Sequence, residues 1–276
     1  MHPPRLEPGF TLAELAIVLV IVSFLLGGMM AMFSSQQDTR KWNDTQSRLE
    51  AARDAILGFA IANGRLPCPA AYKDATSVGT EVRQASGTCG VAPHNPTTNP
   101  QDYYGGTVAG VTYGLLPAVT IGYQPVDSQG FALDGWGNRI GYAVSAASYP
   151  NFTNAATLKA NGVSTLPNDL LVCASAAPAT GISAGPPTTC GAATNSVTNQ
   201  NIVVAVLYSP GKNGLGQVTR GLDEAANGKL TGANDAIFIS HTPTPSTYVN
   251  GEFDDQVLWI PIGTLYSKLI AAGVLP

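Results

Sequence analysis

The 276-residue chain is long enough for one large domain or two small ones, and its apolar fraction of 45% can form a substantial core. Charged residues make up only 12%, whereas there are 30 glycines and 20 prolines, which is typical of a loop-rich β protein outside the cytoplasm. The net charge is -4 and no basic run extends beyond Arg40 and Lys41, so we expect no nucleic-acid partner.

An uncharged apolar segment lies close to the N-terminus. Residues 15–33 contain no charge, and at ~1.5 Å per residue a helix of this length approaches the ~30 Å thickness of the hydrocarbon core of a membrane. We therefore expect one membrane-spanning helix, and no second segment of this kind follows it. A cleaved secretory signal is the alternative, but residues 33–37 (FSSQQ) match a signal-peptidase site poorly.

The residues just before the apolar segment carry the most specific motif in the chain. Residues 9–15 read GFTLAEL, which resembles the type IV prepilin signal G-F-T-L-x-E-L of type IV pilins and type II secretion pseudopilins. The resemblance implies that a prepilin peptidase cuts between Gly9 and Phe10 and that the new Phe10 amine is methylated. It also implies that Glu14, the fifth residue of the mature chain, pairs with the N-terminal amine of a neighbouring subunit.

Elementary electrostatics also singles out Glu14. A carboxylate at the edge of a membrane span costs on the order of a few kcal/mol unless it is paired or reaches the interface. The cleaved amine of Phe10 from the next subunit would supply a cation. The alternative is that Glu14 lies among lipid headgroups.

An amphipathic pattern continues beyond the apolar segment. Apolar or small residues recur at spacings of three or four, which is the period of a helix with one buried face. Asn63, Gly64 and Pro67 provide a stop signal. The sequence therefore predicts a single helix from about Phe10 to Ala62. The residues of the stripe are Trp42, Thr45, Leu49, Ala52, Ile56 and Phe59.

The rest of the chain has the pattern of a β-sheet domain. Short β-branched runs are separated by clusters rich in glycine, proline, asparagine and threonine. We read these runs as an antiparallel sheet, with the nearly continuous apolar run 202–207 as its central strand and residues 262–275 as a closing helix. The runs are 111–116, 139–145, 169–175, 202–209, 236–240 and 256–260.

The predicted fold class is therefore α+β. A long N-terminal helix, with a membrane half and an amphipathic half, packs on an antiparallel sheet with long loops. The predicted segments are a leader (1–9), a transmembrane half-helix (10–33), an amphipathic half-helix (34–63) and a β-rich head (64–276).

Four cysteines without a C-x-x-C pair fit disulfides in an oxidising compartment better than a metal site. The nearest partners are Cys68 with Cys89 and Cys173 with Cys190, each closing a loop worth about 3 kcal/mol in chain entropy. Four cysteines allow three pairings, and the local pairing is the one that we favour.

Two short segments of the head resemble parts of type II secretion major pseudopilins. Residues 134–142 contain D-G-W-G-N and Tyr142, and residues 208–214 read YSPGKNG, similar to a Y-S-x-G-x-D-G loop that helps to hold calcium in that family. Here Asn213 replaces the aspartate of that loop. Asp223, Glu224 and Asp235 follow closely and could complete a set of oxygen ligands for calcium. The alternative for Asp134 is an ordinary turn with a packed tryptophan.

The expected function is structural. The chain lacks a G-x-S-x-G elbow, an H-E-x-x-H pair and a complete phosphate-binding loop, so we expect no enzyme. The resemblance implies a minor pilin-like or pseudopilin subunit, first in the inner membrane with its head in the periplasm and then in a filament there or on the cell surface. Its partners would be other subunits, the prepilin peptidase, the inner membrane and its assembly platform.

A binding module is the alternative function from another class. An adhesive pilin would present aromatic side chains on its long loops to a glycan, a surface or DNA. The candidate side chains for this role are Tyr103, Tyr104, Tyr113 and Tyr123.

Overall fold

The structure is a computed structural model of the whole chain, which divides into two compact units, residues 1–43 and 44–276. Gly9, Phe10 and Asp235 lie outside the described residues, and so do the side chains of residues 26–35. The described residues are 11–90, 101–108, 110–146, 151–161, 170–176, 190–199, 201–214, 221–229 and 236–275.

The predicted N-terminal helix is confirmed as α1 (Leu12–Asn63), which ends one residue before Gly64. Gly64 has a positive φ of 67° and its N–H donates to the carbonyl of Ala60, as expected for a glycine that ends a helix. In the first unit the large apolar side chains between Leu12 and Leu25 are exposed, Leu12 by 87% and Phe24 by 79%.

The prediction of a membrane-spanning half is wrong. No helix in the described part of the chain has a stretch that is both long enough and apolar enough to cross a membrane. The predicted single-pass inner-membrane localisation is corrected accordingly.

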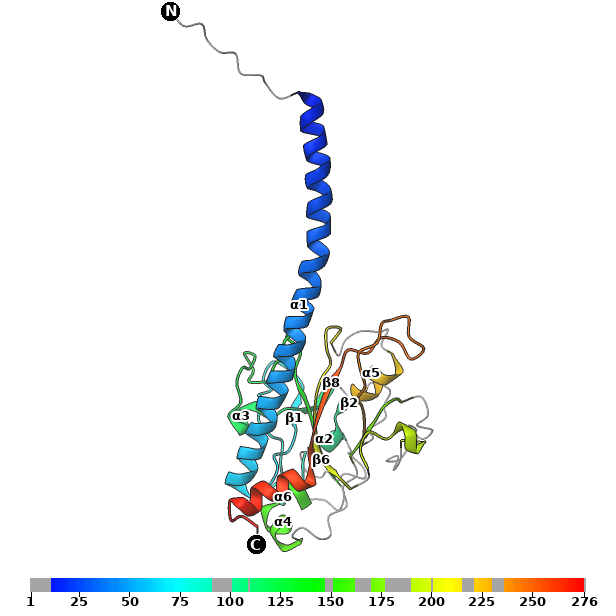
Figure 1. The fold of residues 1–276 in the computed structure, drawn as a ribbon. Coiled ribbons are helices and arrows are strands. Elements are labelled where there is room, and N and C mark those ends of the chain that lie inside the picture. The colour runs from blue at the N-terminus through cyan, green and yellow to red at the C-terminus, as the bar shows by residue number, and fades with distance from the viewer. Residues whose placement is uncertain are drawn as a thin grey trace, which may run out of the picture. The chain divides into compact units, whose positions relative to one another are not determined.

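The predicted amphipathic stripe of α1 is confirmed in the second unit. Thr45, Leu49, Ala52 and Ile56 are at most 2% exposed, because they face the core formed with the sheet. The charged side chains of α1 in the second unit lie at positions between those of the stripe. Figure 1 shows α4 and α6 near the C-terminal end of α1, and Gly64 approaches side chains of Ala155 and Val274 there.

An antiparallel sheet forms the centre of the second unit. Its strands run in the order β1-β3-β4-β6-β8, and β2 also pairs with β3, on the edge opposite to β1, because Thr112 lies opposite both Tyr72 of β1 and Thr107 of β2. All residues of β6 are buried, so the predicted central strand is confirmed. The bounds are β1 (Ala70–Tyr72), β2 (Gly106–Val108), β3 (Val111–Leu115), β4 (Gly141–Val144), β6 (Val203–Ser209) and β8 (Gln256–Pro261).

Two of the predicted strands do not belong to this sheet. β5 (Leu171–Cys173) and β7 (Ile237–Ile239) form a separate parallel pair, in which Leu171 lies opposite Ile237. The expectation that all strands form one antiparallel sheet is therefore wrong for this pair. Both strands are fully buried apolar runs, and such runs carry no periodicity that distinguishes a parallel from an antiparallel partner.

Short helices connect and close the sheets. The predicted closing helix is confirmed as α6 (Ile262–Ala271), which buries Leu265, Tyr266 and Leu269. The other short helices are α2 (Gln101–Tyr104), α3 (Ala118–Ile121), η1 (Asn151–Thr153), α4 (Ala155–Asn161), η2 (Ala193–Asn195) and α5 (Leu222–Asn227).

Both predicted local disulfides are confirmed. Cys68 is bonded to Cys89 and Cys173 to Cys190, with Cα–Cα distances of 5.4 and 5.6 Å. The sulfur atoms belong to residues that are at most 2% exposed, so each bond lies within the core that it closes.

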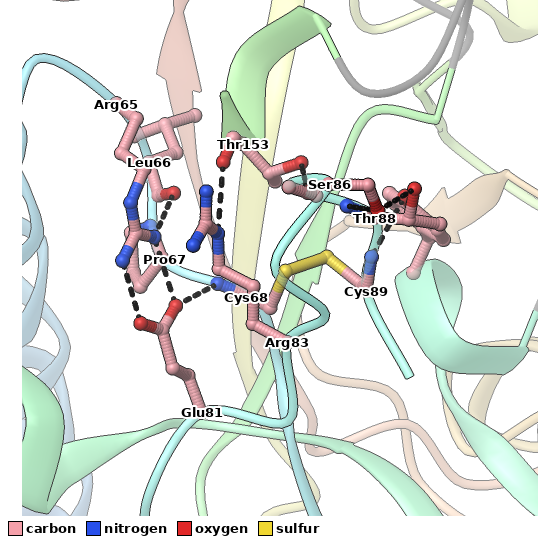
Figure 2. The surroundings of a disulfide bond; sticks show 12 residues. Arg65, Leu66, Pro67, Cys68, Glu81, Arg83, Ser86, Thr88, Cys89 and Thr153 are labelled. Atoms are coloured by element: carbon pink, nitrogen blue, oxygen red, sulfur yellow. Dashed lines mark hydrogen bonds and ion pairs between the residues drawn. A yellow bond between two sulfur atoms is a disulfide. The ribbon is translucent and has the colours of Figure 1, made fainter. Parts of the chain in front are cut away.

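An ion pair supports the first disulfide (Figure 2). Arg65 and Glu81 form two hydrogen bonds, of 2.6 and 2.9 Å, and Oε2 of Glu81 also accepts the backbone N–H of Cys68 at 3.0 Å. Arg83 donates from Nε to the carbonyl of Thr153 at 3.2 Å. These side chains tie the start of the loop to its return, because Glu81 contacts the backbone of the bonded cysteine directly.

The α1 stripe predicts a clear difference between two isoleucines. Ile56 is fully buried, so Ile56→Ala should lower the free energy of unfolding by about 2–5 kcal/mol in urea denaturation. Ile61 is 36% exposed, so Ile61→Ala is the matched control and should cost less than about 1 kcal/mol. Equal losses in the two variants would contradict the packing of α1 described here.

Candidate functional site

Glu14 closes a hydrogen-bonded ring at the start of α1. Its Oε2 accepts both the backbone N–H and the hydroxyl of Thr11 at 2.8 Å, and Oγ1 of Thr11 accepts the N–H of Glu14 at 3.3 Å. This is a capping box, in which the residue before the helix and the third helical residue satisfy each other's backbone N–H groups. The T-x-x-E spacing in the sequence signals it, although the prepilin resemblance alone did not predict it.

The capping box also sets the charge of Glu14. Hydrogen bonds from the backbone and then the side chain of Thr11 lower the pKa of the Glu14 carboxyl. Glu14 is exposed and therefore ionised near neutral pH. Its carboxylate can form an ion pair with a cation such as an amine. Phe10, its predicted partner, lies outside the described residues.

The D-G-W-G-N segment forms a turn organised by a buried carboxylate. Asp134 is 1% exposed; its Oδ1 accepts the N–H groups of Trp136 and Asn138 at 2.9 and 2.8 Å, and its Oδ2 accepts the hydroxyl of Ser209 at 2.6 Å. Burial raises the pKa of Asp134, opposed by these hydrogen bonds. Asp134 therefore lies in a turn, which is the alternative that the sequence offered for it.

Side chains of α1 form hydrogen bonds with this turn. The N–H of Gly135 donates to Oγ1 of Thr45 at 2.9 Å, and Nη1 of Arg48 donates to the carbonyls of Leu133 and Asp134, both at 2.9 Å. Asp44, one turn earlier on α1, forms an ion pair with Arg48. The motif therefore holds the helix in the second unit by polar contacts that supplement the apolar stripe.

The loop at residues 210–214 lies beside the turn. Nδ2 of Asn138 donates to the carbonyl of Gly211 at 2.6 Å, and the N–H of Lys212 donates to Oδ2 of Asp254 at 3.0 Å. The amide of Asn213 donates to both carboxylate oxygens of Glu224 at 3.1 and 2.9 Å. The loop thus links the turn with an acidic cluster.

The acidic cluster consists of Glu224, Asp254 and Asp255. One carboxylate oxygen of each lies within 4.8 Å of the others, and this set could hold a divalent cation. Glu224 and Asp255 are buried and Asp254 is partly buried. Burial, and next the negative charge of Glu224, raise the pKa of Asp254 to about 7. The sequence alone predicts Asp254 and Asp255 in a turn or at a solvated edge before a strand, because they lie far from the loop along the chain; the structure instead brings them to Glu224.

Two of the predicted calcium ligands, Asn213 and Asp223, face different groups. Asn213 faces Glu224 with its amide, and Asp235 lies outside the described residues. The carboxylate of Asp223 instead accepts from Ser175 Oγ, the N–H of Ala176 and Nδ2 of Asn250, and it also lies against Nε2 of His241. Asp223 is therefore committed to a different network, and calcium binding remains a prediction for the acidic cluster.

The network around Asp223 contains serine, aspartate and histidine. The hydroxyl of Ser175 donates to one carboxylate oxygen of Asp223 and the imidazole of His241 lies against the other. A nucleophilic serine would instead contact the imidazole that removes its proton. The order found here places the carboxylate between the two and holds a loop together.

The tyrosines predicted for an adhesive surface are largely internal. Tyr103, Tyr104 and Tyr123 are at most 4% exposed, and Tyr113 is half-buried. The hydroxyl of Tyr103 accepts the N–H of Cys89, and that of Tyr123 donates to the carbonyl of Arg48. The prediction that these rings line a binding surface is wrong for the three buried tyrosines, because their rings lie inside the protein.

Comparison with known proteins adds no assignment to these residues. No family model, no curated protein and no solved structure matches the chain.

The acidic cluster predicts an unusual pH dependence. The pKa of Asp254 is about 7 in the folded protein against about 3.9 unfolded, so the stability that its proton contributes is full below about pH 4 and is lost as the pH rises through 7. Asp254→Asn should therefore be about 1 kcal/mol more stable than the wild type near pH 8, after allowance for partial solvent screening, and equal to it near pH 4. Urea denaturation at both pH values measures this difference.

Asp54→Asn is the control, since the Asp54 side chain is 69% exposed on α1. Its pH profile should follow that of the wild type. Calcium added near pH 8 should stabilise the wild type and leave Asp254→Asn unchanged if the cluster holds the ion. An unchanged wild type would contradict the calcium prediction, and a wild-type profile in Asp254→Asn would contradict the assigned titration.

Proposed function

We propose that the chain is a minor pilin-like or pseudopilin subunit, which assembles into a type IV pilus or a type II secretion pseudopilus after cleavage by a prepilin peptidase. The observation that carries the proposal is the start of α1. A prepilin-like GFTLAEL segment leads directly into a helix of 52 residues, whose apolar side chains from Leu12 to Leu25 are exposed.

The exposed side chains support assembly because a helix that is apolar on all sides is stable only when it is buried. Ile17, Val18, Leu19, Val20 and Ile21 follow one another along the chain and are 52–61% exposed, so they cover every side of the helix. Packing among the equivalent helices of neighbouring subunits in a filament would remove this surface from water, at about 25 cal/mol per Å².

Glu14 supports the proposal through its charge and its geometry. The capping box uses Oε2 for both bonds from Thr11, so among the described residues Oε1 is available to a further donor. The lowered pKa keeps the carboxylate ionised. An amine at the N-terminus of a neighbouring mature subunit would match it in charge and, if Phe10 begins that subunit, in position along the helix.

The size of the head favours a minor subunit over a major one. Residues 44–276 form one unit with two sheets and two disulfides, which is more than a subunit needs if it serves only to build the shaft. The acidic residue at the fifth mature position argues against the pseudopilin class that lacks this acid.

Mass spectrometry of filaments sheared from cells tests the proposed processing. We expect a peptide that begins at methylated Phe10, at low copy number relative to the other subunits of the filament. Processed protein that is missing from the sheared fraction would favour the secretion pseudopilus. A chain that still begins at Met1, or one that begins near Gln36, would contradict the proposal.

A pair of variants separates assembly from capping. Glu14→Val removes the carboxylate and the cap, whereas Thr11→Val removes the side-chain part of the cap and keeps the carboxylate. We expect Glu14→Val to abolish incorporation into filaments at an unchanged cellular level, and Thr11→Val to retain most of it. Glu50→Val, at an exposed acidic residue of α1, is the control and should assemble normally. Equal loss in the first two variants would assign the effect to the cap, and normal assembly of Glu14→Val would refute the pairing.

An adhesive role is the second candidate function. The observation that favours it is an exposed apolar tip formed by Tyr248 (50%) and Val249 (87%), close to Leu222 (59%). The backbone N–H of Leu222 donates to the carbonyl of Asn250, so the three side chains belong to adjoining segments. Adhesion of cells that carry Val249→Asp, compared with wild-type cells, would test it.

A further inference from the structure

The chain contains five asparagines that are each followed by glycine. Asparagine is one of the chemically labile residues of proteins, and its deamidation begins when the backbone nitrogen of the next residue attacks the side-chain carbonyl carbon. Glycine in that next position has no side chain to obstruct the attack. The nitrogen must lose its proton before it attacks, so a hydrogen bond from this N–H to a carbonyl slows the reaction. The five Asn–Gly steps are 63–64, 161–162, 213–214, 227–228 and 250–251.

Three of these steps have a hydrogen-bonded glycine. In each of them the glycine N–H donates to the carbonyl of a residue three or four positions earlier. The distances are 2.8 Å from Gly64 to Ala60, 3.0 Å from Gly228 to Glu224 and 2.9 Å from Gly251 to Tyr248. The structure therefore holds all three attacking nitrogens in place. The glycine of a fourth step, Gly162, lies outside the described residues.

The step from Asn213 to Gly214 differs from these three. Gly214 is buried, and among the described residues no acceptor receives its N–H. The step lies between β6 and α5, outside any helix or strand, and the side chain of Asn213 is partly exposed to water. Gly214 has a φ of 61°, and a Cβ at this position would lie 2.6 Å from Oδ1 of Asn138. The local backbone therefore requires the glycine that also makes the step reactive.

The amide of Asn213 joins its loop to α5. Its Nδ2 donates to both carboxylate oxygens of Glu224, at 3.1 and 2.9 Å. Both hydrogen bonds use the nitrogen that deamidation removes. A carboxylate in its place has no proton to donate and would face Glu224 with a like charge. Deamidation at this step would therefore remove a contact between the loop and α5, whereas Asn63 is exposed and its Nδ2 contacts only the carbonyl of Phe59.

We propose that Asn213 is the principal deamidation site of the folded protein. The nitrogen of Gly214 loses its proton and bonds to Cγ of Asn213, the Cγ–Nδ2 bond breaks, and the amino group takes up a proton and leaves as ammonia. Water then opens the resulting succinimide at either carbonyl carbon, which gives aspartate or isoaspartate at position 213. Water is the only other reactant. The modification is independent of the proposed function, and it separates the loop from α5 irreversibly.

Peptide mapping of the folded full-length protein, incubated at neutral pH, tests the site. Mass spectrometry measures the fraction of aspartate and isoaspartate at each step, and an unincubated sample corrects for deamidation during digestion. We expect Asn213 to react at least about tenfold faster than Asn227 and Asn250, a factor that corresponds to a glycine hydrogen bond of ~1.4 kcal/mol. In urea, where the backbone hydrogen bonds are lost, the three rates should become similar.

The comparison between the folded and the unfolded chain decides the result. An advantage of Asn213 that disappears in urea supports the proposal. Similar rates at the three asparagines of the folded protein, or an equal advantage of Asn213 in urea, would overturn it.

Ammonia release from two variants gives a second measurement. Asn213→Gln keeps an amide but closes a less favourable six-membered ring, so the folded variant should release much less ammonia than the wild type. Asn63→Gln is the matched control, since the Gly64 N–H is already hydrogen-bonded, and it should release as much as the wild type. Undiminished release from Asn213→Gln would contradict the assignment.

Discussion

The second unit depends most on one buried carboxylate. Asp134 accepts from Ser209 at the end of the central strand and from two amides of its own turn, so the strand and the turn share one fixed point. The carbonyls and the amide that this turn presents are the ones that contact Arg48 and Thr45 on α1. Without the carboxylate, the turn would lose the hydrogen bonds that hold these groups in the orientation in which they contact the helix. A short polar residue thereby fixes where the apolar stripe of α1 meets the sheet.

A series of hydrogen bonds leads from the same turn to the acidic cluster, in which like charges lie close together. Asn138 contacts Gly211, the next residue Lys212 contacts Asp254, and Asn213 contacts Glu224. Three acidic side chains then lie close together, and burial, followed by the negative charge of Glu224, raises the pKa of Asp254. A proton or a cation relieves such a cluster. Proteins tolerate this kind of local conflict mainly where it serves a function, and the acidic cluster is therefore the part of the head most sensitive to solution conditions.

The sequence revealed elements that depend on local patterns. The stripe of α1, the apolar run of β6 and the two short cysteine loops each lie within one continuous segment, so spacing and composition sufficed to predict them. The parallel pairing of β5 with β7 and the partners of Asp223 arise between segments far apart in the chain, and no local period encodes them. The tyrosines misled because loop composition suggested exposure, whereas the rings of Tyr103 and Tyr123 fill the core and their hydroxyls reach backbone groups. The strands β1 and β2 contain only three residues each and give no alternating pattern.

The two units differ in how far the contacts within each unit supply partners for its polar groups and bury its apolar side chains. In the second unit, buried or partly buried polar groups such as Asp134, Asp223 and Glu81 each have several donors, and both disulfides close within it. In the first unit, Glu14 caps its own helix through Oε2 alone, and the apolar side chains around α1 remain exposed. A helix with this surface exposes apolar side chains that its own unit does not bury. Because the exposed apolar side chains cover every side of the helix, one partner surface cannot bury all of them, and several neighbours are needed. A bundle of equivalent helices meets that condition, which is why assembly accounts for this half of α1 better than a binary complex does.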